Sequence, residues 1–154
     1  MGLVQWRQSG RSSGPTWTLF TTGEIGTLGN TSGVLSSAIS NDSTSDELDL
    51  YMDAELVVTF AAAPTTDSLV ELYVVRTVDG TNFEDSSTEQ RPKLGFVGGW
   101  VVNDSTVAQR LVIPQVRLPP EDFRLYAFNN TGQAFSTNGT NVVRGLFYTE
   151  NVST

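Results

Sequence analysis

The feature that most constrains this chain is a two-residue alternation of apolar and polar side chains, most regular in "LDLYMDAELVVTF" at 48–60. Its even-numbered positions are all apolar: Leu48, Leu50, Met52, Ala54, Leu56, Val58 and Phe60. The odd-numbered positions include Asp49, Asp53 and Glu55, whose carboxylates would be costly inside a core. Because successive side chains of a strand point to opposite faces, the stretch predicts a β-strand with one face in the core. We expect the other face to meet water or a partner.

Seven further segments also predict strands: 16–22, 32–40, 68–77, 94–102, 108–118, 122–130 and 141–149. Turn residues such as Asp79-Gly80 and Pro119-Pro120 separate them, and no segment has the period of an amphipathic helix. Pro114 lies inside the 108–118 pattern, and it predicts an edge strand or a bulge because proline cannot donate to a ladder. About eight closely spaced strands predict an all-β fold, as an antiparallel sandwich, a jelly roll or a closed barrel.

Residues 1–15 differ from the rest of the chain. They are rich in Gly, Ser and Gln and carry Arg7 and Arg11, but no acid, since the first carboxylate is that of Glu24. We interpret this segment as an extended basic arm that docks on another molecule through Trp6. The alternative is a terminus that rests Trp6 on its own domain. We expect residues 16–154 to form one all-β domain.

Composition excludes several classes of function. The chain has no cysteine and no histidine, which removes Ser-His-Asp and Cys-His catalysis and the common zinc sites. Glu84 and Asp85 are adjacent, so on a strand they face opposite ways and cannot converge on one bond. We therefore expect no enzyme, cofactor or metal. A net charge of −8 argues against nucleic acid, and the longest apolar run is far shorter than the roughly 20 residues of a membrane-spanning helix.

Two acidic stretches leave a calcium site as an alternative. The segment 41–49 offers alternating Asp and Thr side chains, and the stretch "DGTNFED" offers Asp79, Thr81 and Asp85. Neither has the glycine and the bidentate glutamate that an EF-hand places at fixed offsets. Turn formation explains both stretches more simply, because Asp and Ser side chains bond the backbone where strands end.

The aromatic residues suggest a second alternative, a carbohydrate-binding surface. Tyr51 and Tyr73 lie on the less apolar faces of strands that we expect to be neighbours, so they would form a platform beside the Asp79–Asp85 loop. Core packing and subunit contact are the competing explanations. In "VRLPPEDFRLYAFNNTG" at 116–132, Arg117 and Arg124 belong either to a structural turn or to an arginine contact with a neighbouring subunit's carboxylate.

Three stretches together resemble a known family. They are "LYVVRTVDGTNFEDSS" at 72–87, "FVGGWVV" at 96–102 and "RLVIPQVRLPPEDFRLYAFNNTGQAF" at 110–135. The pattern resembles small structural proteins of tailed bacteriophages, of the head decoration or cement type. It covers about 68–137 and consists of strands and turns without a catalytic motif. The N-terminal third has no counterpart in it.

The resemblance implies a β-sandwich or jelly-roll module that sits on the capsid surface of the virion, often as a trimer. We expect a homotrimer that binds the major capsid protein, with no nucleic acid and no membrane as partner. The residues expected at partner contacts are Trp6, Arg7, Arg11, Tyr73, Phe83, Arg117 and Arg124. The alternatives are a carbohydrate-binding module, or another structural protein of the phage tail, neck or fibre.

Overall fold

The computed structural model describes residues 3–8, 16–41, 48–77, 79, 81–84, 91–92 and 95–153, with the backbone alone for 3–8, 16 and 150–153. These residues form nine strands and one short helix: β1 (Leu3–Gln8), β2 (Thr16–Phe20), α1 (Thr22–Ile25), β3 (Gly33–Leu35), β4 (Tyr51–Val58), β5 (Leu69–Arg76), β6 (Phe96–Val101), β7 (Gln109–Arg117), β8 (Phe123–Asn130) and β9 (Val142–Ser153). Each of the eight segments predicted to be a strand overlaps one of β2 to β9, although β9 continues beyond its predicted end at 149.

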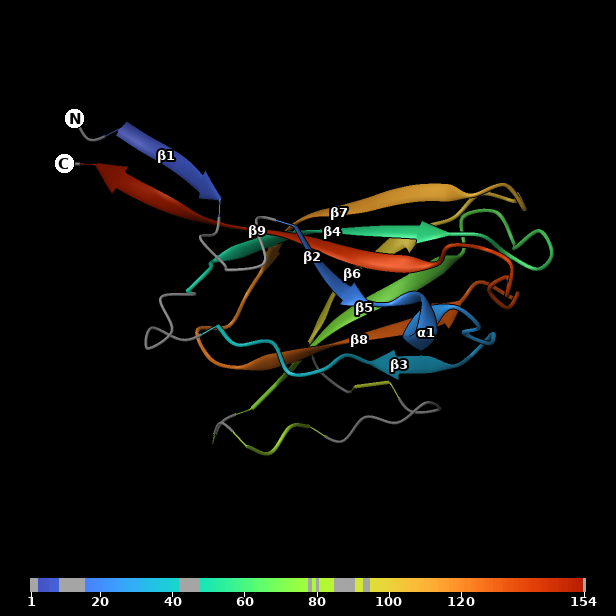
Figure 1. The fold of residues 1–154 in the computed structure, drawn as a ribbon, viewed down its shortest axis with the longest axis horizontal. Helices are drawn as coiled ribbons and strands as arrows, with labels where there is room; N and C mark the ends of the chain where they lie inside the picture. Colours follow the sequence, from blue (N-terminus) through green and yellow to red (C-terminus); the bar gives the residue numbers. More distant parts are fainter. Residues whose placement is uncertain are drawn as a thin grey trace.

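Two antiparallel sheets lie face to face (Figure 1). One has the order β1-β9-β4-β7, with β2 also paired to β9, and the other has the order β3-β8-β5-β6. Strand β2 pairs with β9, β3 with β8, β4 with β7 and β5 with β6, so the second half of the chain pairs back on the first in reverse order. This is the strand order of a jelly roll, and the predicted all-β sandwich is confirmed.

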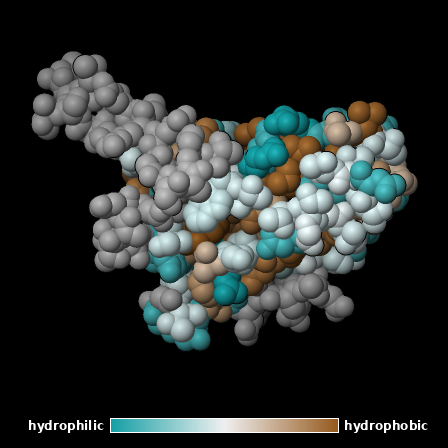
Figure 2. Space-filling view, in the orientation of Figure 1, coloured by the Kyte–Doolittle hydropathy of each residue, from teal (hydrophilic) through white to brown (hydrophobic). Residues whose placement is uncertain are grey.

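The main core lies between the sheets and contains the predicted apolar face from Met52 to Phe60. Leu48 and Leu50, expected on the same face, precede β4 and are 40% and 39% exposed, so that part of the prediction is wrong. In β4, Met52, Ala54, Leu56 and Val58 are fully buried, while the residues between them are half-buried. Large side chains from both sheets fill the space, among them Phe20, Trp100, Phe123 and Phe147. On the face shown in Figure 2, hydrophobic residues lie in separate patches among neutral and hydrophilic ones.

The expectation that Asp49 shares an outward face with Asp53 and Glu55 is wrong. Asp49 precedes β4 and is buried, and its backbone N–H donates a hydrogen bond of 2.8 Å to the Asn41 side-chain oxygen. The alternation does not extend to Asp49 because the strand begins only at Tyr51. Asp53 and Glu55 lie within β4 and are half-buried on its outer face.

Pro114 marks both an edge strand and a bulge, as its sequence context predicted. Strand β7 is at the edge of its sheet, and its register with β4 shifts between Met52 and Ala54. Gln115, next to Pro114, has a φ of 54°. Its N–H donates instead to the Asp53 carboxylate at 2.8 Å. The Asp53 side chain of β4 thus accepts a hydrogen bond from a backbone N–H that has no ladder partner at the bulge.

Strand β5 is buried on both faces. Val70, Leu72 and Val74 belong to the main core, whereas Tyr73 and Val75 lie in a second cluster with Tyr126 and Phe128 of β8. Register explains this cluster, because Tyr73 is directly opposite Tyr126. The second cluster covers the outer face of the β3-β8-β5-β6 sheet, and we call it the outer cluster.

Strand β9 extends beyond the sandwich. It pairs with β4 over Val142–Tyr148 and with β1 over Tyr148–Ser153, so its last residues have β1 as their strand partner within the described residues. Figure 1 shows β1 and the end of β9 as a two-stranded ribbon that projects from the sandwich. We call this pair of segments the terminal ribbon.

Candidate functional site

The chain after β5 folds into a tight turn around Asp79. One carboxylate oxygen of Asp79 accepts hydrogen bonds from the backbone N–H groups of Asn82 (2.7 Å) and Thr81 (2.9 Å) and from the Thr77 hydroxyl (3.0 Å). The Asn82 side-chain amide donates to the other oxygen at 2.7 Å. These hydrogen bonds, that of the Asn82 N–H first, hold the pKa of Asp79 well below its usual range, because they stabilise the charged form. Asp79 therefore acts as a turn residue.

In the described part of the chain, no three acidic side chains are placed to hold a metal ion. Asp85 and most of 41–49, on which the calcium alternative depended, lie outside the described residues. The described residues also include no helix that is both long and apolar enough to span a membrane.

Three of the residues expected at partner contacts meet on one face. Tyr73 belongs to the outer cluster, and Phe83 packs against that cluster from the β5–β6 connection. The Arg124 guanidinium lies over the Phe83 ring, 4.5 Å from its centroid. Such cation–π contacts favour a fixed arginine geometry. Phe83 and Arg124 are half-buried, whereas Tyr73 is only 8% exposed.

Tyr51 and Tyr73 do not form the expected platform. Strand β4, which carries Tyr51, and strand β5, which carries Tyr73, belong to different sheets. Tyr51 stacks instead on Tyr148 of β9, with ring centroids 5.8 Å apart. The prediction failed because the connection between β4 and β5 crosses from one sheet to the other. The carbohydrate-binding alternative thereby loses the platform on which it was based.

Arg117 of β7 lines a cleft whose other half is lined by Asp79. Two adjoining cavities of about 460 Å³ and 450 Å³ share Val74, Arg76 and Gly95. Phe83 lines the first cavity, and Arg117 lines the second. The cavity with Phe83 is lined mainly by apolar surface, whereas the one with Arg117 is as polar as it is apolar. Such a mixed composition is suited to binding a side chain of a protein partner.

Gly95 shapes the cleft where β6 approaches β5. Its φ is +89°, and a Cβ there would lie 2.1 Å from the Val74 carbonyl oxygen. The Gly95 carbonyl accepts a hydrogen bond of 2.8 Å from the Val74 N–H. Only glycine suits this close approach. At the rim, the Arg76 guanidinium donates to Glu121 through Nε at 2.8 Å, which fixes one of the cleft's two arginines.

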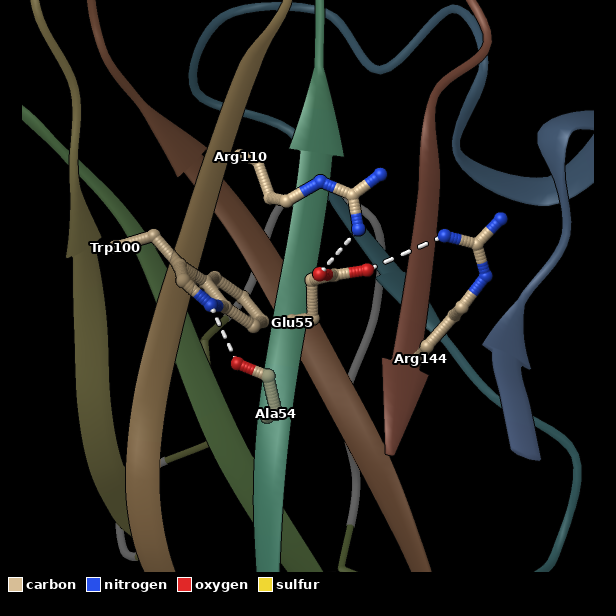
Figure 3. Close-up of polar contacts among 5 residues, drawn as sticks. All are labelled: Ala54, Glu55, Trp100, Arg110 and Arg144. Carbon is tan, nitrogen blue, oxygen red and sulfur yellow. Dashed lines mark hydrogen bonds and ion pairs between the residues drawn. The ribbon is translucent and has the colours of Figure 1, made fainter. Parts of the chain in front are cut away.

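The outer face of the other sheet carries a charged cluster (Figure 3). Glu55 of β4 accepts hydrogen bonds from Arg110 of β7 at 2.6 Å and from Arg144 of β9 at 3.2 Å. Next to it, the Tyr148 hydroxyl donates to Asp53 at 2.9 Å. These contacts join three neighbouring strands across one surface. Both carboxylates of β4 thus have hydrogen-bond donors on the neighbouring strands.

Of the three arm residues expected at partner contacts, two belong to the terminal ribbon. Trp6 and Arg7 are in β1, opposite Glu150 and Thr149 of β9. Arg11 lies outside the described residues.

Sequence reasoning missed two residues of the outer cluster face. Glu71 is on β5 and is 6% exposed, and Arg91 lies in the β5–β6 connection and pairs with it at 3.3 Å. The alternation in β5 contained a signal for Glu71, because it stands two residues before Tyr73 on the same face. The sequence has no such signal for Arg91, whose contact depends on how the connection folds back.

Tyr73 and Tyr148 are expected to lose their phenolic protons near pH 12. Burial first, and then the hydrogen bond to Glu71, raises the pKa of Tyr73 from 10.0 to about 12. Burial and the bond to Asp53 do the same for Tyr148. Because the folded pKa is the higher one, this stabilisation is fully present below the unfolded pKa of 10.0 and is lost as the pH rises towards 12.

The ultraviolet absorbance of phenolate, followed as the pH is raised, tests the raised pKa values of Tyr73 and Tyr148. The variants Tyr73→Phe and Tyr148→Phe should each remove one late-titrating group from the curve. The assignment is wrong if either variant leaves the late phase unchanged.

Comparisons of the chain with protein-family models, with curated proteins and with solved structures give no match.

Proposed function

We propose that the chain is a head decoration, or cement, protein of a tailed bacteriophage. In this proposal it binds the lattice of the major capsid protein on the virion surface as a homotrimer and stabilises the head. The resemblance of residues 68–137 to such proteins suggests the role, and the jelly-roll sandwich is compatible with it. The half-buried Phe83 and Arg124, which lie against the buried outer cluster, and the cleft with Arg117 are the surfaces that we assign to subunit contacts.

The terminal ribbon is the observation that carries this proposal. A two-stranded ribbon is marginally stable in water by itself, and unpaired strand edges tend to pair with other chains. Past Tyr148, β9 has β1 as its strand partner within the described residues, and the ribbon projects from the body (Figure 1). Docking on the capsid lattice would cover this edge, with Trp6 and Arg7 of β1 at the contact.

Exposed apolar residues support self-association of the body. Phe96 and Val101 at the two ends of the edge strand β6 are 57% and 51% exposed, and Val112 of β7 is 56% exposed. A trimer multiplies the contacts that each complex makes with the lattice, so individually weak contacts add up. A protein that binds the assembled lattice and not its free subunits stabilises the lattice by mass action.

Deletion of residues 1–8 tests the role of the ribbon. We expect the truncated protein to fold and to keep its native mass, because the deletion removes β1 and leaves β2 to β9. Its affinity for heads assembled from the cognate major capsid protein should fall at least about tenfold, measured by cosedimentation. The matched control is Arg110→Ala, which changes an exposed arginine of the body and should bind heads normally.

Three outcomes count against parts of the proposal. If the truncated protein decorates heads as well as the full chain, the ribbon is not the docking element. If the full chain does not cosediment with heads, the decoration role is wrong, and cosedimentation with tails would favour a tail, neck or fibre protein. A monomer in native mass spectrometry would overturn the trimer.

A further inference from the structure

A buried carboxylate lies beside the outer cluster. The Glu71 side chain is 8% exposed, and it accepts hydrogen bonds from the Tyr73 hydroxyl at 2.6 Å and from the Asn130 side-chain amide at 3.0 Å. Neither donor carries a positive charge. A buried carboxylate is costly unless a cation pairs with it, so this position calls for a cationic partner.

Strand register surrounds this carboxylate with aromatic rings. Glu71 of β5 is directly opposite Phe128 of β8, and Tyr73 is opposite Tyr126, so all four side chains share one face. The Tyr126 and Phe128 rings stack at 23°, with centroids 6.4 Å apart, and Tyr73 meets Tyr126 edge-on at 6.0 Å. The sheet therefore presents a carboxylate beside ring faces, which are the two partners that a guanidinium group favours.

Arg91 supplies the cation from outside the sheet. Its guanidinium carbon lies 4.1 Å from the centroid of the Phe128 ring, and its Nη1 lies 3.3 Å from the Glu71 carboxylate. The Arg91 side chain is 42% exposed, in contrast to the 8% of Glu71. The two groups that contact the guanidinium, the Glu71 carboxylate and the Phe128 ring, belong to the paired strands β5 and β8, whereas Arg91 belongs to the connection between β5 and β6.

We propose that Glu71, Tyr73, Tyr126 and Phe128 form a guanidinium-binding site, which Arg91 fills as an internal ligand and so fastens the β5–β6 connection to the sheet. The site is built by β5 and β8, so it persists when the Arg91 side chain is absent. It then accepts a free alkylguanidinium ion, the chemical class of an arginine side chain. This inference does not depend on the decoration role.

Methylguanidinium binding to Arg91→Ala tests the proposal. The variant should melt at a lower temperature than the original protein. Methylguanidinium should bind it with a dissociation constant on the order of millimolar, as expected for so small a ligand, and should raise its melting temperature in a saturable way. The original protein should show no saturable response, because Arg91 already occupies the site.

Two variants serve as controls. The double variant Arg91→Ala/Glu71→Gln removes the carboxylate and should lose the methylguanidinium response. Arg110→Ala also removes an arginine paired with a carboxylate, since Arg110 donates to Glu55 at 2.6 Å. Among the described residues, however, no aromatic ring lies against the Arg110 guanidinium. Arg110→Ala should therefore show no saturable binding.

The ionisation of Tyr73 gives an independent readout. The positive charge of Arg91 lowers the pKa of Tyr73, against the larger effects of burial and of Glu71. The Tyr73 pKa should therefore rise in Arg91→Ala and fall again when methylguanidinium is added. A free ion in solution that only screened charge would not restore it in a saturable way.

The proposal is overturned if folded Arg91→Ala binds methylguanidinium no better than Arg110→Ala does. If Arg91→Ala does not fold alone, methylguanidinium should restore folding. Failure to restore it, together with normal folding of Arg91→Lys, would show that the position needs only a tethered positive charge, and the site would not be one for guanidinium.

Discussion

Replacing Trp100 with alanine is expected to lower the free energy of unfolding by about 3–5 kcal/mol. Trp100 of β6 is 1% exposed and is among the largest fully buried side chains. Its indole N–H donates a hydrogen bond of 3.0 Å to the Ala54 carbonyl of β4, in the opposite sheet (Figure 3). The change therefore leaves a large cavity and also removes a polar link between the two sheets.

Urea unfolding followed by circular dichroism measures this loss, and two further variants separate its causes. Trp100→Phe keeps much of the buried ring but removes the donor to Ala54, so it should cost about 1–3 kcal/mol. Val107→Ala changes a residue that is 73% exposed and should stay within about 0.5 kcal/mol. A loss below about 1.5 kcal/mol for Trp100→Ala would contradict a central place for the indole in the core.

Replacing Asn129 with alanine is expected to cost about 3 kcal/mol or more, although the residue is small and polar. Asn129 has no exposed surface, and its amide donates to the carbonyls of Leu28 (3.1 Å) and Gln133 (2.7 Å). Its side-chain oxygen accepts from the Thr131 hydroxyl (2.7 Å) and backbone N–H (3.2 Å). Alanine would leave several of these buried polar groups unpaired.

The same unfolding assay tests this, with Asn138→Ala as the matched control. Asn138 is exposed at a turn, so its replacement should change stability by no more than about 0.5 kcal/mol. Asn129→Asp should keep the bonds from Thr131 but place a carboxylate against two carbonyl oxygens. It should therefore be destabilised at neutral pH and recover partly in acid. Equal stability of Asn129→Ala and Asn138→Ala would show that the buried bonds contribute little.

The candidate site was predictable only in part. Tyr73, Phe83 and Arg124 were predicted from the sequence as contact residues, and the structure places all three at the outer cluster. It did not predict the Glu71–Arg91 pair. The reason is that Arg91 lies in a connection without periodic pattern, where the position of a side chain depends on the surface that the connection meets.

The terminal ribbon was not predicted either. Residues 1–15 suggested an extended basic arm, but not that Leu3–Gln8 would form a strand paired within the chain. Its partner is the Tyr148–Ser153 end of β9, at the opposite end of the chain. A short strand gains its hydrogen bonds only from a partner, and nothing local in the sequence identifies a partner that distant.

The sequence by itself determined where β2 to β9 lie and which side of β4 enters the core, because the alternation of side chains is a local property of extended backbone. It also predicted an edge strand or a bulge at Pro114, because proline has no N–H to donate to a ladder whatever the partner. The tertiary structure alone decided that Tyr51 and Tyr73 lie in different sheets and that β5 is buried on both faces. Which strands pair, and which sheet faces are covered, depends on free energies summed over segments distant in the chain. Both are therefore fixed only when the whole sandwich assembles.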